Sequence, residues 1–201
     1  MKIAIFGAGG HGKVAADIAI SNGYKEILFF DDKNKKNQIN NIGRYCGNIN
    51  KALDLDLKIP IFVAIGENLI REKIYQKFRN KSKTFVSLIH PSAIVSDYAK
   101  IGKGVIVMPN VVINSHSKIS KGNIINTSSS IDHDCSISKF CHICPGVNIA
   151  GNVKIGQFSF IGVGSNVSNN LKIGKNVYVT GGSFVYNNIP PNQKYKFISI
   201  V

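Results

Sequence analysis

The residues best suited to do chemistry lie in the short string Asp132-His133-Asp134. Imidazole is the side chain that titrates closest to neutral pH, so His133 can act as a general base. A neighbouring carboxylate can orient such a ring and stabilise its protonated form, and Asp134 follows His133 directly. The string therefore predicts a site of proton transfer.

A second candidate site is a glycine-rich turn near the start of the chain. An apolar stretch, residues 2–6, leads into the pattern Gly7-x-Gly9-x-x-Gly12 and then into a helical pattern. Such glycines let the backbone approach a pyrophosphate, and the helix N-terminus offers N–H groups. Asp31 ends the next apolar stretch 19 residues after Gly12, near the usual distance for a ribose contact. This order is the Rossmann arrangement and predicts a nucleotide-binding, Rossmann-like α/β unit.

The elements that must position the glycine turn fill the first part of the chain. We predict strands over residues 2–6, 27–30, 59–64 and 84–89, and helices beginning after Gly12 and over 67–79. The predicted unit, residues 1–88, is about half the size of a full dinucleotide domain. Its size favours a single nucleotide carrying a sugar over NAD.

The elements around His133 follow a six-residue repeat. From Ile89 to Val185 every sixth residue is Ile or Val, 17 positions in succession. The fourth residue after each of these is mostly small or aliphatic, and the residue directly after is mostly Gly, Asn, Ser or Asp, which tolerate tight corners. A period of six is typical of a parallel β-helix, in which short strands stack coil upon coil. We predict such a domain over residues 89–201.

The Cys141-x-x-Cys144 pair has a structural explanation in this repeat. Cys141 falls on an inward small position and Cys144 on a corner. Both, with Cys46 and Cys135, are expected to be reduced thiols, and no metal site is predicted.

Composition excludes several classes of protein. Hydrophobic residues make up 44% of 201 residues, which argues against disorder, and no apolar run approaches the ~18 residues of a membrane span. The glycine motif begins too early for a signal peptide, so we expect a cytoplasmic protein. The net charge of +14 comes from scattered lysines with only three arginines, a pattern that favours anionic small molecules over nucleic acid.

Together, the two predicted domains resemble the bacterial nucleotide-sugar acetyltransferases related to sialic acid O-acetyltransferase. The resemblance covers nearly the whole chain and is strongest for the UDP-4-amino-sugar N-acetyltransferases of N,N′-diacetylbacillosamine biosynthesis. The strings that carry it are Gly9-Gly10-His11-Gly12, Phe30-Asp31-Asp32, Ala64-Ile65-Gly66, Leu88-Ile89-His90, Ile125-Asn126-Thr127-Ser128-Ser129, Asp132-His133-Asp134-Cys135, His142 and Ala150-Gly151-Asn152-Val153.

The resemblance implies a left-handed, hexapeptide-repeat β-helix and a role for each candidate residue. His133 would be the catalytic base and Asp134 its orienting carboxylate, an Asp where the similar branch has Glu. The Gly151 N–H would stabilise the thioester oxygen, His142 would contact the acetyl group, and Gly181 would lie along the coenzyme A arm. Asn126 is expected at the sugar. The residues expected to hold UDP are Gly9, Gly10, His11, Asp31, Asp32 and Gly66.

The resemblance also implies the reaction and the assembly. Acetyl-CoA would acetylate the 4-amino group of a UDP-linked 4-amino-4,6-dideoxy sugar, without a metal. His133 and His142 are nine residues apart, half of an 18-residue coil, so they face different sides of one prism. A site that uses both must lie between subunits, and the resemblance implies a homotrimer.

Other functions remain open at this stage. The acceptor could be a sialic acid hydroxyl, or a GDP- or dTDP-linked amino sugar. Five histidines would also allow a zinc enzyme like the γ-type carbonic anhydrases, and a non-catalytic nucleotide-sugar sensor would share the first domain. The Gly-x-Pro-Ala-Lys-like tail of the family is absent here, so Lys194 and Lys196 are the candidates for the coenzyme A phosphates.

Overall fold

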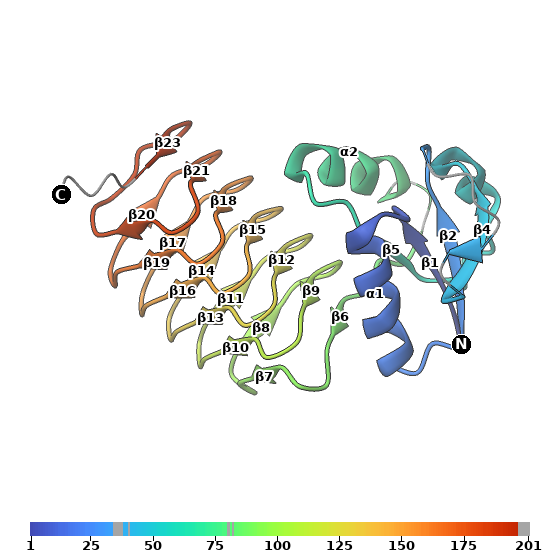
Figure 1. The fold of residues 1–201 in the computed structure, drawn as a ribbon, viewed down its shortest axis with the longest axis horizontal. Helices are drawn as coiled ribbons and strands as arrows, with labels where there is room; N and C mark the ends of the chain where they lie inside the picture. Colours follow the sequence, from blue (N-terminus) through green and yellow to red (C-terminus); the bar gives the residue numbers. More distant parts are fainter. Residues whose placement is uncertain (34–37, 40, 80, 82, 197–201) are drawn as a thin grey trace. The chain divides into compact units, whose positions relative to one another are not determined.

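The computed structural model describes residues 1–33, 38–39, 41–79, 81 and 83–196. The chain divides into two compact units, unit 1 (Met1–Pro91) and unit 2 (Ser92–Val201), which are drawn in Figure 1 and are described separately. In the described residues, no helix is both long and apolar enough to cross a membrane.

Unit 1 is an α/β domain built on a largely parallel sheet. The sheet order is β3-β4-β2-β1-β5; β2 and β5 flank β1 in parallel, and only β3 is antiparallel, to β4. The elements are β1 (Lys2–Phe6), α1 (Gly10–Ser21), β2 (Glu26–Phe30), β3 (Gln38–Ile39), β4 (Gly43–Gly47), the 3-10 helix η1 (Ile49–Asp54), β5 (Ile61–Val63), α2 (Asn68–Arg79) and β6 (Leu88–Ile89).

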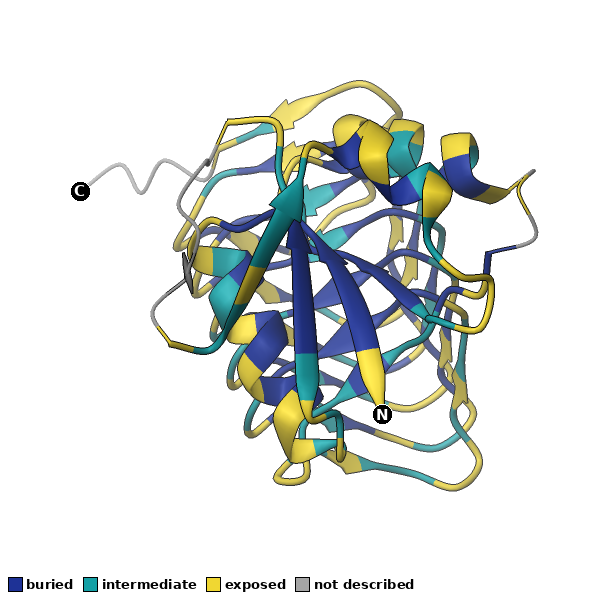
Figure 2. Cartoon of the chain, turned by 90° about the vertical axis from the view of Figure 1, so that its right-hand side faces the viewer, coloured by how far each residue is buried: buried dark blue, intermediate teal, exposed yellow. Residues whose placement is uncertain are grey.

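The core of unit 1 explains why these segments pair. β1 and β2 are continuous apolar runs, as expected for strands covered on both faces, and Figure 2 shows them buried over most of their length. Phe6 packs against Phe30 and Phe78, with ring centroids 5.8 and 4.7 Å apart. The predicted strand over 84–89 is shorter than expected: it consists of a single bridge from Phe85 to Ile61, followed by β6.

Two glycines of the predicted turn are required by close contacts. Gly7 has a φ of +104°, a backbone conformation that residues other than glycine rarely adopt. A Cβ on Gly12 would lie only 2.0 Å from the Gly7 carbonyl oxygen, so α1 can approach β1 only with glycine there. The pattern thus packs the helix onto the strand that precedes it.

Unit 2 consists of short parallel strands stacked into three sheets, which we call faces I, II and III. Face I contains β7 (Ile94–Val95), β10 (Val112–Ile113), β13 (Ser130–Ile131), β16 (Asn148–Ile149), β19 (Asn166–Val167) and β22 (Phe184–Val185). Face II contains β8 (Lys100–Ile101), β11 (Lys118–Ile119), β14 (Ser136–Ile137), β17 (Lys154–Ile155) and β20 (Lys172–Ile173). Within unit 2, face III contains β9 (Ile106–Val107), β12 (Ile124–Ile125), β15 (His142–Ile143), β18 (Phe160–Ile161), β21 (Tyr178–Val179) and β23 (Lys194–Tyr195).

The register of the sheets gives the coil length and the core. Ile113 pairs with Ile131 and Ile131 with Ile149, so each coil spans 18 residues. Each of the 17 positions of the repeat is the second residue of a strand, from β6 to β22. Ile131, Ile137 and Ile143 are completely buried, and burying each aliphatic side chain contributes about 1.5–3 kcal/mol. The predicted stack of parallel strands is confirmed.

Four-residue corners join the faces, and their third residue carries the strain of the turn. At this position φ is positive, for example +61° at His116 and +59° at Asp134. We expected the tight position to be the first corner residue, directly after the Ile or Val. Glycines at the first position serve a different purpose: a Cβ on Gly156 would lie 2.4 Å from the backbone nitrogen of Lys175 in the next coil.

Candidate functional site

His133 and Asp134 form an exposed pair on the corner between β13 and β14, the I/II corner. His133 Nδ1 lies 2.8 Å from Asp134 Oδ2, and the two side chains are 57% and 55% exposed. Asp134 can reach back to the preceding residue because its φ of +59° turns the backbone at that point. The carboxylate accepts a hydrogen bond from Nδ1–H, which leaves Nε2 as the atom that can take a proton from a substrate.

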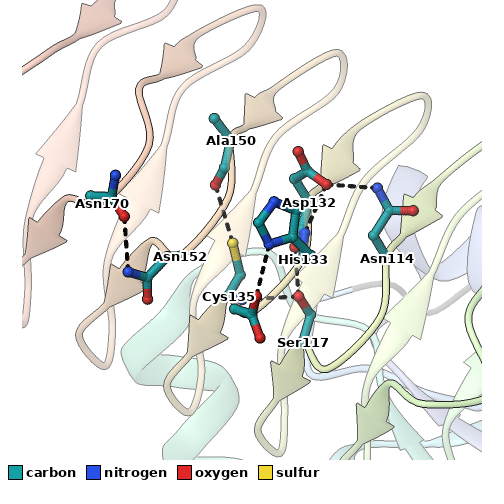
Figure 3. Close-up of polar contacts among 9 residues, drawn as sticks. Asn114, Ser117, Asp132, His133, Cys135, Ala150, Asn152 and Asn170 are labelled. Carbon is teal, nitrogen blue, oxygen red and sulfur yellow. Dashed lines mark hydrogen bonds and ion pairs between the residues drawn. The ribbon is translucent and has the colours of Figure 1, made fainter.

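Asp132, the residue before His133, binds the His133 backbone and not its ring. Its Oδ1 accepts hydrogen bonds from the His133 backbone N–H and from Nδ2 of Asn114, each at 2.8 Å (Figure 3). These two bonds lower the pKa of Asp132, so it stays ionised. The hydrogen bond that His133 donates to Asp134, followed by the charge of Asp132, raises the pKa of His133 above its ordinary value. The corner therefore contains an imidazole that is a stronger base than usual.

Gly151 lies against the His133 ring, one coil further along. A Cβ built on Gly151 would come within 2.7 Å of both Cε1 and Nε2 of the ring. Its backbone N–H donates no hydrogen bond within the described coils, whereas the neighbouring Asn152 N–H donates to the His133 carbonyl at 2.9 Å. Gly151 therefore leaves room for the ring and offers an N–H group beside it.

Asn126 and His142 form a second group, on face III and the corner that follows it. The Asn126 amide oxygen accepts from the Thr127 N–H at 2.9 Å, so its amide nitrogen is the donor to His142 Nε2, at 3.1 Å. The His142 ring also packs edge-on against Phe160, with centroids 5.2 Å apart. Gly181 follows β21, another strand of face III, and so lies on the same edge of the coils as Asn126. The predicted residues of unit 2 thus fall into two groups on different parts of the coil.

The predicted nucleotide residues of unit 1 gather around the first turn of α1. Gly9 precedes the helix and Gly10 begins it; a Cβ on either would meet no atom within 4 Å, and the same is true of Gly66 after β5. The backbone at these points is open to a ligand. The helix has no acidic residue in its first turn, so its N–H groups and positive dipole are available to an anion.

His11 lies in this turn with its Nε2 buried and without a hydrogen-bond partner among the described residues. Burial lowers the pKa of His11 to about 4, and the charge of Arg71 adds to the effect. The ring is therefore neutral at physiological pH, with a nitrogen left for a further interaction.

The two aspartates after β2 bind backbone N–H groups, a role that the sequence did not indicate. Asp31 accepts from the N–H groups of Ala8 and Lys33, both at 2.7 Å, and Asp32 accepts from the N–H of Ile49 at 2.9 Å. Asp31 thereby ties the glycine turn to the end of β2.

Arg71 is a residue that sequence reasoning missed. It is 1% exposed and donates to the carbonyl oxygens of Ile65 and Gly66, at 2.8 and 3.0 Å, and to the Asn68 side chain at 2.7 Å. It fixes the loop between β5 and α2, beside His11. The one signal in the sequence that could have drawn attention to Arg71 was the scarcity of arginine, of which the chain has only three.

The Cys-x-x-Cys pair is part of the packing. Cys141 and Cys144 are buried, and burial raises the pKa of the Cys144 thiol to about 12. Cys141 Sγ lies 3.1 Å from the Gly156 carbonyl oxygen. Within the described residues, no group of three or more His, Cys, Asp or Glu side chains is arranged to hold a metal ion.

Comparison with known proteins links both units to one family. Residues 2–78 match the family described as PglD N-terminal domain. The chain is 32% identical over 110 residues to UDP-N-acetylbacillosamine N-acetyltransferase of Bacillus subtilis, an alignment that spans 53% of this chain and 51%, about half, of that relative.

Solved structures extend the similarity to nearly the whole chain. The acetyltransferase domain of PglB from Neisseria gonorrhoeae, in complex with acetyl coenzyme A, is 36% identical, with a TM-score of 0.93 and coverage of 96% of this chain and 94% of that one. A mutant of perosamine N-acetyltransferase from Caulobacter crescentus, in complex with CoA and GDP-perosamine, is 33% identical, with a TM-score of 0.89 and coverage of 95% and 91%. With this identity over nearly the full length of both folds, the chain belongs to the family of nucleotide-sugar acetyltransferases.

Proposed function

We propose that this protein transfers an acetyl group from acetyl-CoA to the 4-amino group of a UDP-linked 4-amino-4,6-dideoxy sugar. The names of the relatives support amide formation on a nucleotide-linked amino sugar. The observation that carries the proposal is the His133 ring, oriented by Asp134 and placed against Gly151.

The base acts on the amine. As the amino nitrogen attacks the thioester carbonyl carbon, a C–N bond forms and the nitrogen loses a proton to His133 Nε2. Asp134 holds Nδ1 and stabilises the imidazolium that results. When the C–S bond breaks, the thiolate of CoA leaves and takes the proton from His133, which returns the ring to its neutral form.

The remaining residues of unit 2 are assigned to the thioester. The Gly151 N–H is proposed to stabilise the negative charge that develops on the carbonyl oxygen. His142 is proposed to contact the acetyl group, with its ring fixed by Asn126, and Gly181 to lie along the coenzyme A arm. Lys194 and Lys196 are the proposed partners of the coenzyme A phosphates.

The nucleotide is assigned to the glycine turn of unit 1. Gly9, Gly10 and Gly66 offer open backbone, and the α1 N-terminus favours an anion. The buried Nε2 of His11 supports a hydrogen bond to the ligand. Asp31 and Asp32 are proposed to act mainly by shaping the turn through their backbone hydrogen bonds.

A second acceptor class is favoured by a specific observation. The Caulobacter relative, 33% identical over 95% of this chain, was crystallised with GDP-perosamine. A GDP-linked amino sugar is therefore the alternative substrate, and the assay should include it beside UDP- and dTDP-linked acceptors and sialic acid.

The test is an assay of purified protein with acetyl-CoA and each acceptor, with release of free thiol and the mass gain of one acetyl group as readouts. We expect turnover with the UDP-linked 4-amino sugar. His133→Ala should lower kcat at least ~100-fold, the usual contribution of a general base, without weakening the binding of the nucleotide sugar.

Lys103→Ala is the matched control, because Lys103 is an exposed corner residue outside the proposed site. It should leave kcat unchanged. Absence of thiol release with every acceptor would contradict the proposal, and binding without turnover would indicate a sensor. Full activity of His133→Ala would exclude His133 as the base.

For the assembly, we infer a homotrimer of left-handed β-helices with active sites shared between subunits. His133 and His142 are nine residues, or half a coil, apart, and this separation supports sharing. A cytoplasmic location is supported by the four cysteines, none of which forms a disulfide.

A further inference from the structure

The corner that carries His133 and Asp134, residues 132–135, is held from inside the β-helix by one buried hydroxyl group. Ser117 is the last residue of the corner one coil earlier, and it is completely buried. Its Oγ donates to the Asp132 carbonyl oxygen at 2.6 Å and accepts from the Cys135 N–H at 3.0 Å (Figure 3). A single side chain therefore bridges the first and the last residue of this corner.

A corner can also close without such a group. At residues 96–99, on the same edge of the coils, the N–H of Ala99 donates directly to the carbonyl oxygen of Ser96 at 2.9 Å. At residues 132–135 the two corresponding groups are joined through the Ser117 hydroxyl. The hydroxyl is thus inserted into the hydrogen bond that would otherwise close the turn.

The two bonds of Ser117 fix the peptide groups on either side of the His133–Asp134 pair. The Asp132 carbonyl belongs to the peptide group that contains the His133 N–H, and the Cys135 N–H belongs to the peptide group after Asp134. Between them Asp134 has a φ of +59°, in the left-handed region. The directions of the two side chains depend on how these peptide groups are turned.

The polar residue stands where the proposed site needs it. The inward residues at the position of Ser117 on this edge are, coil by coil, Ala99, Ser117, Cys135, Val153 and Leu171. Of these, only Ser117 and Cys135 have a polar side-chain atom. Cys135 Sγ lies 3.2 Å from the Ala150 carbonyl oxygen, in the peptide group that contains the Gly151 N–H (Figure 3). The two polar residues therefore bind the corners of His133 and Gly151.

We propose that Ser117 is a positioning residue, which holds the His133 ring and the Asp134 carboxylate in their catalytic arrangement through the two peptide groups that it binds. The inference rests on the proposed function. Without the hydroxyl the corner can close directly, as at residues 96–99, and both peptide groups would turn. Because Ser117 is buried beneath the corner, its loss should lower the rate of the chemical step and leave substrate binding nearly unchanged.

The test compares Ser117→Ala with Ser159→Ala, a closely matched control. Ser159 is also completely buried, and its Oγ donates to the Gly174 carbonyl oxygen at 2.8 Å and accepts from the Val177 N–H at 3.1 Å. This second corner, residues 174–177, has no role in the proposed reaction. Each substitution removes the same two bonds from a buried position, so both should lower the thermal midpoint by a similar amount.

Only Ser117→Ala should affect catalysis. We expect its kcat to fall about tenfold or more, with KM for both substrates within about twofold of the wild type, and Ser159→Ala to keep kcat within about twofold. Ser117→Cys, which copies Cys135 one coil further along, should recover part of kcat. If Ser117→Ala does not fold, Ser117→Cys against Ser159→Cys makes the same comparison.

An NMR titration of the His133 ring in the full chain, without substrate, separates this inference from the proposed function. A ring held less closely by Asp134 loses the main cause of its raised pKa. The pKa of His133 should therefore fall toward 6.5 in Ser117→Ala and keep its wild-type value in Ser159→Ala. The other titratable groups of the hollow that Asp134 borders are the same in both variants: His116, Lys118, Cys135 and Lys154.

The inference is overturned if His133 titrates alike in Ser117→Ala and Ser159→Ala, or if the two variants lose kcat equally. Absence of turnover by the wild-type protein would contradict the proposed function instead, and the titration would still decide whether Ser117 positions the ring.

Discussion

Two carboxylates act on one imidazole at the I/II corner, and they act differently. Asp134 holds Nδ1 through a hydrogen bond, while Asp132 binds the backbone N–H of His133 and contributes its charge. Both raise the pKa of His133, and the hydrogen bond that Asp134 accepts from the ring is the larger effect. A base with a raised pKa takes a proton more readily but must be neutral to act, so its activity depends on pH.

Asp134→Asn tests this division of roles. His133 works in its neutral form, so kcat/KM should rise with pH through the His133 pKa, which lies above its ordinary value of 6.5. Loss of the carboxylate lowers this pKa, and the rise should move to lower pH. The plateau should also fall about tenfold or more, because the ring loses its orienting partner. The measurement is kcat/KM against pH.

Asp132→Asn is the companion variant, because an amide oxygen can still accept from the His133 N–H. It should shift the rise in the same direction but by less, and keep most of the plateau. A midpoint that stays in place or moves to higher pH in Asp134→Asn would contradict the role given to the carboxylate.

At this scale the sequence was informative where neighbours in sequence are neighbours in space. The His133–Asp134 contact links adjacent residues, and the resemblance predicted it. The Asn114–Asp132 bond joins residues one coil, or 18 positions, apart, and the repeat contained the signal for it. The Arg71 hydrogen bonds depend on how α2 packs beside the β5 loop, which no local pattern encodes.

At the scale of elements, the stacking of coils brings His133 and Gly151 together. They occupy the same corner position 18 residues apart, so the repeat that forms the core also aligns the site. Gly151 does not have a positive φ, and the backbone there tolerates other residues. The restriction at this position comes only from the His133 ring.

Gly151→Ala should therefore damage catalysis more than stability. The new methyl group would meet the ring at 2.7 Å, so the ring must move away from its place beside Asp134. A displacement of this kind should lower kcat on the order of 10- to 100-fold. The thermal midpoint should change little, and both quantities can be measured on the same sample.

The control is Asn169→Ala, because Asn169 occupies the same corner position as Gly151 one coil further along. It tests whether a change of side chain at this corner position is by itself harmful. It should leave kcat close to the wild-type value. Wild-type kcat in Gly151→Ala would mean that the His133 ring has another productive position.

The two units differ in how well the sequence predicted their elements. In unit 2 every position of the repeat ends a strand, because inward aliphatic residues are all that each coil needs to stack. In unit 1, β3 and β4 were missed. β4 is Gly-Arg-Tyr-Cys-Gly, a half-exposed segment without an alternating pattern, which pairs with β2 only because the rest of the sheet is present.

At the scale of the whole molecule, three faces and three corners limit how the site can be completed. His133 lies on the corner between faces I and II, and Asn126 lies on the corner between faces III and I. Face I therefore lies between the two groups. Three copies arranged with face I toward a threefold axis would bring the His133 corner of one copy beside the Asn126 corner of the next.

The residues on the outside of face I agree with burial in an assembly. Ile94 and Phe184, near its two ends, are 67% and 48% exposed in the single chain. Between them, Ser130, Asn148 and Asn166 form a hydrogen-bonded ladder, with bonds of 2.9 and 3.0 Å. This uncharged surface contrasts with face II, where four strands begin with a lysine: Lys100, Lys118, Lys154 and Lys172.

Mixing two inactive variants tests the shared site directly. His133→Ala and His142→Ala each remove one group, so each pure protein should have little activity. When trimers assemble at random from equal amounts of the two variants, about a quarter of the interfaces would pair an intact His133 with an intact His142, and activity should recover to about a quarter of the wild type. The mass from light scattering should be three times that of the subunit for all samples. If both groups acted within one subunit, every site would contain one substitution and mixing would restore nothing.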